Sequence, residues 1–230
     1  MLYEHIFFDL DRTLWDFDTN SRETLLELSD KYKLKSKGVV SIDDFITDYY
    51  HINERMWLEY GNGLIDKNTL RYDRFYQALV KYSITDRSLA ENFGNDYISL
   101  SPLKTNLFPH AIEVLDYLNK KYKLHIITNG VEEVQHIKIK NCGIQGYFGE
   151  IITSERSGFK KPDTRIFQYS IDSVKTTTTS SLMIGDSLEA DIIGARSAGL
   201  HQVYFNPAEQ KHEENITYEI KNLKELMGFL

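Results

Sequence analysis

The chain begins with a short apolar run that ends at a carboxylate. His5-Ile6-Phe7-Phe8 is too short for a helix and is rich in residues that favour strands. It therefore predicts a buried strand with Asp9 at its carboxyl end. Beyond it, from about residue 20 to residue 100, apolar residues recur at three- and four-residue spacing, which is typical of amphipathic helices.

This helical stretch has several predicted boundaries. Asn20 and Ser41 are each followed three residues later by an acidic side chain, a pattern that predicts two helix starts. Gly61-Asn62-Gly63 interrupts the periodicity and predicts a turn. We interpret residues 15–104 as an all-helical domain inserted after the first strand.

After Pro109 strands and helices alternate. Helices are predicted at 110–121, 131–141, 163–173, 189–198 and 219–229, and strands at 124–128, 149–153, 182–186 and 202–205. Such alternation predicts an α/β fold, a doubly wound and mostly parallel sheet with helices on both faces. Its core domain would comprise residues 1–14 and 105–230. Ligands of such sheets bind beyond the carboxyl ends of the strands.

Composition narrows the class of protein. The 230 residues suffice for a core domain with a smaller insert, and the net charge of −7 argues against a nucleic-acid polymer or a membrane surface as partner. The single cysteine, Cys142, cannot form an internal disulfide. No apolar stretch reaches the roughly 18 residues of a membrane span, and charges flank the first apolar run. We expect a cytoplasmic enzyme, monomeric or homodimeric, that binds a small molecule.

Polar residues follow three of the predicted strands. Asp9 and Asp11 follow the first, Thr128 and Asn129 end the second, and Asp186 ends the fourth. A lone Asp-x-Asp pair often merely caps or turns a chain. Because the carboxyl ends of parallel strands share one edge of the sheet, however, these side chains are expected to converge.

The carboxylates suit phosphoryl transfer. A carboxylate and a phosphate ester repel each other, so a divalent cation held by oxygen ligands must screen them, and Mg²⁺ prefers a sparse carboxylate set. Asp9, Asp186 and a backbone carbonyl near Asp11 could supply these ligands. Asp9 is the predicted nucleophile, which would form a mixed anhydride. Asp11 would protonate the leaving oxygen and then activate water.

The remaining candidates would bind phosphate. Thr128 and Asn129 offer a hydroxyl, an amide and backbone N–H groups to phosphoryl oxygens, and Gly130 would let the backbone approach closely. Lys161 supplies a cation that balances the carboxylates, although its neighbour Lys160 is an alternative.

Four segments carry a family resemblance. DLDRTL, ITNG, KKPDTRIF and GDSLEAD resemble, in order and spacing, the four motifs of the haloacid dehalogenase superfamily. The resemblance implies that Asp9 is the nucleophile, Asp11 the acid and base, and Lys161 the functional lysine because it directly precedes proline. It further implies that Asp186 is a metal ligand, that Asp191 supports the metal site, and that the cofactor is Mg²⁺.

The helical insert resembles the superfamily's C1-type cap, which closes over the core and excludes water. FFDLDRTLWDFD, WLEYGNGLIDKNTLRYDRF and ITNG are similar to pyrimidine 5′-nucleotidases, including those that act on noncanonical nucleotides. Arg12 departs from this pattern, because the resemblance leads us to expect an acidic residue at position 12. We interpret Trp15 and Trp57 as packing residues rather than as platforms on which a nucleobase stacks.

The leading hypothesis is a magnesium-dependent 5′-nucleotidase for pyrimidine nucleoside monophosphates. The same core would also serve a phosphatase of phosphoglycolate or a sugar phosphate, or a phosphomutase. A dehalogenase is disfavoured because halide needs no general acid such as Asp11. A phospho-accepting receiver domain would lack the insert, and a non-catalytic binding protein would not need both Asp9 and Asp11.

Overall fold

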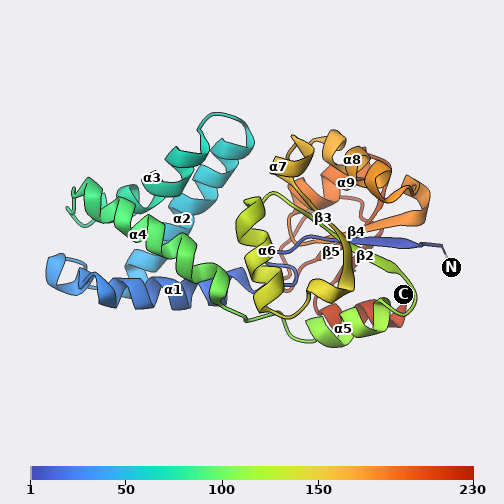
Figure 1. The fold of residues 1–230 in the computed structure, drawn as a ribbon, viewed down its shortest axis with the longest axis horizontal. Coiled ribbons are helices and arrows are strands. Elements are labelled where there is room, and N and C mark those ends of the chain that lie inside the picture. The colour runs from blue at the N-terminus through green and yellow to red at the C-terminus, as the bar shows by residue number, and fades with distance from the viewer. Residues whose placement is uncertain (1) are drawn as a thin grey trace. The chain divides into compact units, whose positions relative to one another are not determined.

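A computed structural model describes residues 2–230 and divides into two compact units. One unit comprises the chain up to Phe17 together with Thr105–Leu230, and the other comprises Asp18–Lys104 (Figure 1). Among residues 2–230, every strand lies in the first unit, and the second unit consists of helices and the short segments that connect them.

The first unit is built on a six-stranded parallel sheet. Its strands are β1 (His5–Phe8), β2 (Lys123–Thr128), β3 (Phe148–Thr153), β4 (Ser181–Gly185), β5 (His201–Phe205) and β6 (Tyr218–Ile220). They lie in the order β3-β2-β1-β4-β5-β6, and each neighbouring pair is parallel. The predicted fold class is confirmed. The strand order reverses beside the central β1, the position where doubly wound sheets bind ligands.

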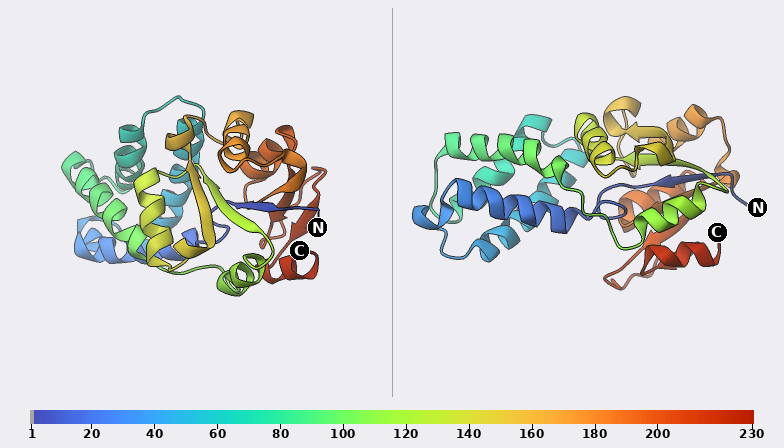
Figure 2. Two further views of the ribbon diagram at one scale, coloured as in Figure 1. Left: turned by 45° about the vertical axis from the view of Figure 1, so that its right-hand side comes forward. Right: turned by 60° about the horizontal axis from the view of Figure 1, so that its bottom comes forward.

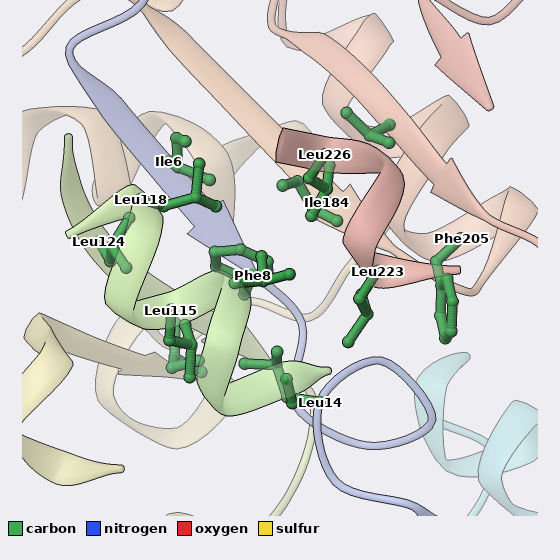
Figure 3. Packing of buried hydrophobic residues seen from close by; sticks show 14 of the residues in the cluster. Ile6, Phe8, Leu14, Leu115, Leu118, Leu124, Ile184, Phe205, Leu223 and Leu226 are labelled. Atoms are coloured by element: carbon green, nitrogen blue, oxygen red, sulfur yellow. The ribbon is translucent and has the colours of Figure 1, made fainter. Parts of the chain in front are cut away.

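Both faces of the sheet are covered, which explains why β1 is buried at every position and why three of its four residues are apolar. Ile6 and Phe8 join one buried cluster, and Phe7 joins another on the opposite face. In the first cluster, Leu115 and Leu118 face β1 (Figure 3). Burial of each such side chain contributes about 1.5–3 kcal/mol, so the central strand is firmly anchored and its end is a rigid platform.

The helices of this unit flank the sheet in two layers. They are α5 (Ala111–Leu118), α6 (Glu132–Asn141), α7 (Ser154–Ser157), α8 (Thr164–Val174) and α9 (Gly194–Ser197), with shorter turns η3 (Gln145–Tyr147), η4 (Thr178–Ser180), η5 (Leu188–Ile193) and η6 (Leu223–Gly228). Helix α5 and η6 lie side by side on one face of the sheet (Figure 2), and α8 packs on the other through Ile166 and Phe167.

The second unit contains all of α1 (Phe17–Lys31) except its first residue, and η1 (Leu34–Lys37), α2 (Ile42–Gly61), α3 (Lys67–Val80), α4 (Arg87–Leu100) and η2 (Ser101–Leu103). The predicted start at Ser41 is confirmed, because its hydroxyl accepts a hydrogen bond from the Asp44 N–H at 3.2 Å. The predicted start at Asn20 is wrong. Helix α1 begins at Phe17, and Asn20 lies buried within it.

Two predicted helices of the first unit also differ. The predicted helix at 219–229 is replaced by β6 and the short η6, because Tyr218–Ile220 pairs with the edge of β5 and Asn222 then caps a new turn. The predicted helix at 189–198 is a π-helical turn, η5, followed by the four-residue α9. No helix in residues 2–230 is long and apolar enough to cross a membrane.

Candidate active site

Three carboxylates converge beyond the ends of β1 and β4. Asp9 follows β1, and its N–H donates to the Ile184 carbonyl at 2.8 Å. One oxygen of each of Asp9, Asp186 and Asp191 lies within 4.8 Å of the others. Asp191 comes from η5 and is almost fully buried. Gly185 makes this possible, because a Cβ there would lie 2.3 Å from Cγ of Asp191.

Lys161 is the cation at the centre of this cluster. Its Nζ donates to Oδ1 of Asp9 at 2.6 Å, to Oδ1 of Asp191 at 2.6 Å and to the Ile127 carbonyl at 2.8 Å. These contacts use all three ammonium donors, and the side chain is only 3% exposed. The structure therefore places Lys161 itself among the carboxylates.

The electrostatics of the cluster are unbalanced. Burial, reinforced by Asp191, raises the pKa of Asp186 to about 7, although a 3.0 Å hydrogen bond from the Thr13 hydroxyl opposes the shift. Burial raises the pKa of Asp9 well above its ordinary value despite Lys161. For Lys161, burial alone would lower the pKa, but Asp191 and Asp9 outweigh it and raise the pKa. Three carboxylates thus share one lysine, an excess of negative charge that suits a divalent cation.

Asn129 fixes the backbone that carries Lys161. Its Oδ1 accepts from the Lys161 N–H at 2.8 Å, and its Nδ2 donates to the Lys161 carbonyl at 2.9 Å. The side-chain amide predicted to bind phosphate is therefore engaged with the main chain, while its backbone lies just beyond β2. Its role in phosphate binding stays a prediction.

Thr128 ends β2 with its hydroxyl enclosed. Its Oγ1 accepts from the Gly130 N–H at 3.0 Å and from Nε2 of Gln135 at 2.7 Å, and the residue is 1% exposed. Gly130 makes room for Gln135, since a Cβ there would lie 2.4 Å from the Gln135 amide. The space left by this glycine is occupied by a side chain of α6.

Asp11 lies outside the carboxylate cluster. Lys138 Nζ contacts its Oδ1 at 2.5 Å, and Gln135 Nε2 donates to its Oδ2 at 2.8 Å. Sequence reasoning did not identify Lys138 or Gln135. The sequence offers no signal that singles them out, because the predicted helix 131–141 is polar at most positions. Metal ligation through a carbonyl near Asp11 stays a prediction.

Trp15, Arg12 and Trp57 each take part in a contact with an aromatic ring. Trp15 is fully buried in the cluster around β1, and Lys138 Nζ lies 4.0 Å from the centre of its ring. The Arg12 guanidinium lies 4.8 Å from the Phe17 ring centre, and Arg12 has a positive φ of 63°. Trp57 belongs to α2 of the other unit and packs edge-on against Tyr60.

Comparison with known proteins identifies the family of this chain. Residues 6–205 match a family model described as haloacid dehalogenase-like hydrolase. The pyrimidine 5′-nucleotidase YjjG of Escherichia coli (strain K12) is 31% identical, with 100% of this chain and 99% of that protein covered. The pyrimidine 5′-nucleotidase PynA of Streptococcus pneumoniae is 29% identical, with 100% and 96% covered.

A solved structure is similar over the same length. The HAD-hydrolase YfnB of Bacillus subtilis, in an orthorhombic crystal form bound to magnesium, superposes with a TM-score of 0.90 at 28% identity, covering 99% of this chain and 98% of that one. The family match spans most of the sequence, and these relatives align with nearly all of it. This chain is accordingly an enzyme that belongs to the haloacid dehalogenase-like hydrolase family.

Proposed function

We propose that this hydrolase is a magnesium-dependent phosphomonoesterase that forms a phosphoaspartyl intermediate on Asp9 and acts on pyrimidine nucleoside monophosphates. The observation that carries the proposal is the convergence of Asp9, Asp186 and Asp191 around Lys161 beside the central strand. The substrate class is supported by similarity to two enzymes named pyrimidine 5′-nucleotidases.

The donor set fits Mg²⁺. Its ligands would be Asp9 and Asp186, with Asp191 supporting the site, and all three offer the oxygen atoms that this cation prefers. Burial, reinforced by the neighbouring carboxylates, raises the pKa values of Asp9 and Asp186, and a divalent cation would offset this cost of burying negative charge. When bound, Mg²⁺ would reduce the repulsion between a carboxylate nucleophile and the phosphoryl oxygens.

The first chemical step belongs to Asp9 and Asp11. Lys161 contacts Oδ1 of Asp9, which leaves Oδ2 for attack on phosphorus. As the new O–P bond forms, the bond from phosphorus to the ester oxygen breaks, and Asp11 donates a proton to that leaving oxygen. The Thr128 hydroxyl accepts both of its hydrogen bonds, so its own proton would be donated to a phosphoryl oxygen, together with backbone N–H groups after β2 other than that of Gly130.

The second step reverses the role of Asp11. The ionised carboxylate of Asp11 takes a proton from water as the water oxygen attacks phosphorus. The bond between phosphorus and Asp9 Oδ2 then breaks, which releases phosphate and restores the Asp9 carboxylate. Lys161, held by three acceptors, keeps Asp9 in one orientation through both steps.

The helical unit, Asp18–Lys104, is proposed to act as the cap that selects the substrate. Its sequence WLEYGNGLIDKNTLRYDRF resembles the corresponding part of pyrimidine 5′-nucleotidases. Water exclusion by such a cap would favour transfer to Asp9 over side reactions.

One assay tests the proposal. Phosphate release is measured from UMP, dUMP and dTMP, and from phosphoglycolate and glucose 6-phosphate, each with Mg²⁺ and with EDTA, using Asp9→Asn as the control variant. We expect Mg²⁺-dependent release, fastest with the pyrimidine nucleotides, and none with Asp9→Asn. Failure to hydrolyse any ester would refute the phosphatase assignment. A preference for phosphoglycolate or glucose 6-phosphate would refute only the nucleotidase assignment.

A further inference from the structure

Asp11 is held by two side chains of one helix. Lys138 and Gln135 lie three positions apart on α6, and each contacts a different oxygen of the Asp11 carboxylate, at 2.5 Å and 2.8 Å respectively. Residues with this spacing occupy the same face of a helix. One face of α6 therefore donates a hydrogen bond to each oxygen of the Asp11 carboxylate.

The two partners are themselves held in place. The Lys138 side chain is 7% exposed and its Nζ lies 4.0 Å from the centre of the buried Trp15 ring. Gln135 is fully buried, and its Nε2 also donates to the Thr128 hydroxyl at 2.7 Å. Buried polar groups are costly unless they are paired, so these side chains are stable here because Asp11 accepts from them.

One atom of this network has no partner. Oε1 of Gln135 is buried and accepts no hydrogen bond from any residue in the range 2–230. An unpaired buried acceptor is unfavourable, and a residue that served packing alone would be better replaced by an apolar one. What Gln135 does provide is an N–H group that connects Asp11 to Thr128.

We propose that Lys138 and Gln135 are positioning residues that fix the orientation of Asp11 for proton transfer to the leaving group. The inference rests on the proposed function, in which Asp11 is the acid and base. The Asp11 side chain is 27% exposed and lies beyond the end of β1, so without these contacts it could rotate freely. A general acid must lie within hydrogen-bond reach of the atom it protonates.

The proposal predicts a dependence on the leaving group. A nucleoside 5′-oxygen is a poor leaving group and needs the proton of Asp11, whereas 4-nitrophenolate departs without one. The parameter kcat/KM covers only the steps up to departure of the leaving group. A misplaced Asp11 should therefore lower kcat/KM for an alkyl phosphate much more than for 4-nitrophenyl phosphate.

The experiment compares Lys138→Met and Gln135→Met with Lys140→Met, which removes an exposed lysine from the same helix. The substrates are 4-nitrophenyl phosphate and the alkyl phosphate that the wild type hydrolyses fastest. General acid catalysis contributes about 10²–10⁴-fold, so we expect a loss of about tenfold or more in kcat/KM for the alkyl ester. The loss for the aryl ester should stay below about threefold. Lys140→Met should match the wild type with both esters.

The second step supplies an independent readout. A misplaced Asp11 activates water poorly, so Lys138→Met should release a rapid burst of 4-nitrophenol, followed by slow turnover as phosphorylated Asp9 accumulates. Gln135→Met carries the test alone if Lys138→Met fails to fold. Equal losses for both esters, or no loss for either, would overturn the proposal. Turnover that survives Asp9→Asn would instead overturn the proposed function on which it rests.

Discussion

Gly185 sits where any side chain would strike a buried carboxylate. In Gly185→Ala, the new Cβ would lie 2.3 Å from Cγ and from Oδ2 of Asp191. Ordinary van der Waals contact begins near 3.4 Å, so Asp191 would have to move by about 1 Å. Asp191 is 1% exposed and is bonded to Lys161 at 2.6 Å and to the Ser187 N–H at 3.0 Å. It cannot move that far and keep both contacts.

The magnitude follows from those contacts. Hydrogen bonds to charged groups contribute about 1.5–3 kcal/mol each, and overpacking adds about 1–3 kcal/mol. Partial relaxation would recover some of this, so we expect Gly185→Ala to lower the free energy of unfolding by about 2–4 kcal/mol. Because a displacement of 1 Å at a reacting centre can reduce rates by about 10²-fold, phosphate release should fall by a similar factor.

Urea unfolding followed by circular dichroism measures the first effect, and phosphate release under saturating Mg²⁺ measures the second. Gly146→Ala is the matched control, because a Cβ there has no atom within 4 Å and Gly146 has no positive φ. If Gly185→Ala unfolds at the same urea concentration as Gly146→Ala and retains the wild-type rate, the close approach of Asp191 to the end of β4 does not matter for the site.

Three further outcomes are expected. Burial, with a contribution from His5, lowers the pKa of His125 to about 4, so the unfolded state binds this proton first as the pH falls below about 6.5. In urea unfolding, the stability of the wild type relative to His125→Asn should therefore fall by at most about 2 kcal/mol between pH 7 and pH 5, and a difference that does not change with pH would contradict this. Mg²⁺ should raise the melting temperature of the wild type, and an equal rise in Asp186→Asn would contradict the assigned ligands. Asn129→Ala, which removes both bonds to the Lys161 backbone, should lower kcat at least about tenfold, and an unchanged kcat would show that Lys161 needs no such support.

The parts of the fold that could be predicted are those in which local pattern and tertiary environment agree. Residues 6–8 place apolar side chains on both faces of the strand, and both faces are covered, so the interpretation of His5–Phe8 as a buried strand required no knowledge of its neighbours. The parallel sheet followed from the alternation of elements. Because parallel strands share their carboxyl edge, the convergence of Asp9 and Asp186 followed as well.

The errors arose where the environment overrides the local pattern. Residues 218–220 become a strand because β5 presents an unpaired edge, which no local periodicity records. Asn20 resembles a cap in sequence, yet the helix begins three residues earlier at Phe17 and buries it. The partners of Asp11 come from a helix more than 120 residues away in sequence, and only the packing of α6 beside the end of β1 brings them together.

Gly130 follows β2 and Gly185 ends β4, and the site requires that neither position carries a side chain. Gly130 was expected to let the backbone approach a phosphoryl group, but its open space is filled by Gln135, five residues later. The space beside Gly185 is occupied in the same way by the side chain of Asp191, six residues later. In both cases the chain turns from a strand into a helical segment and returns one polar side chain over the strand end. The sheet thereby fixes the position of Asp191 near the proposed metal ligands, Asp9 and Asp186, and of Gln135 beside Asp11. Each glycine is thus linked to one of the two chemical roles proposed for the site.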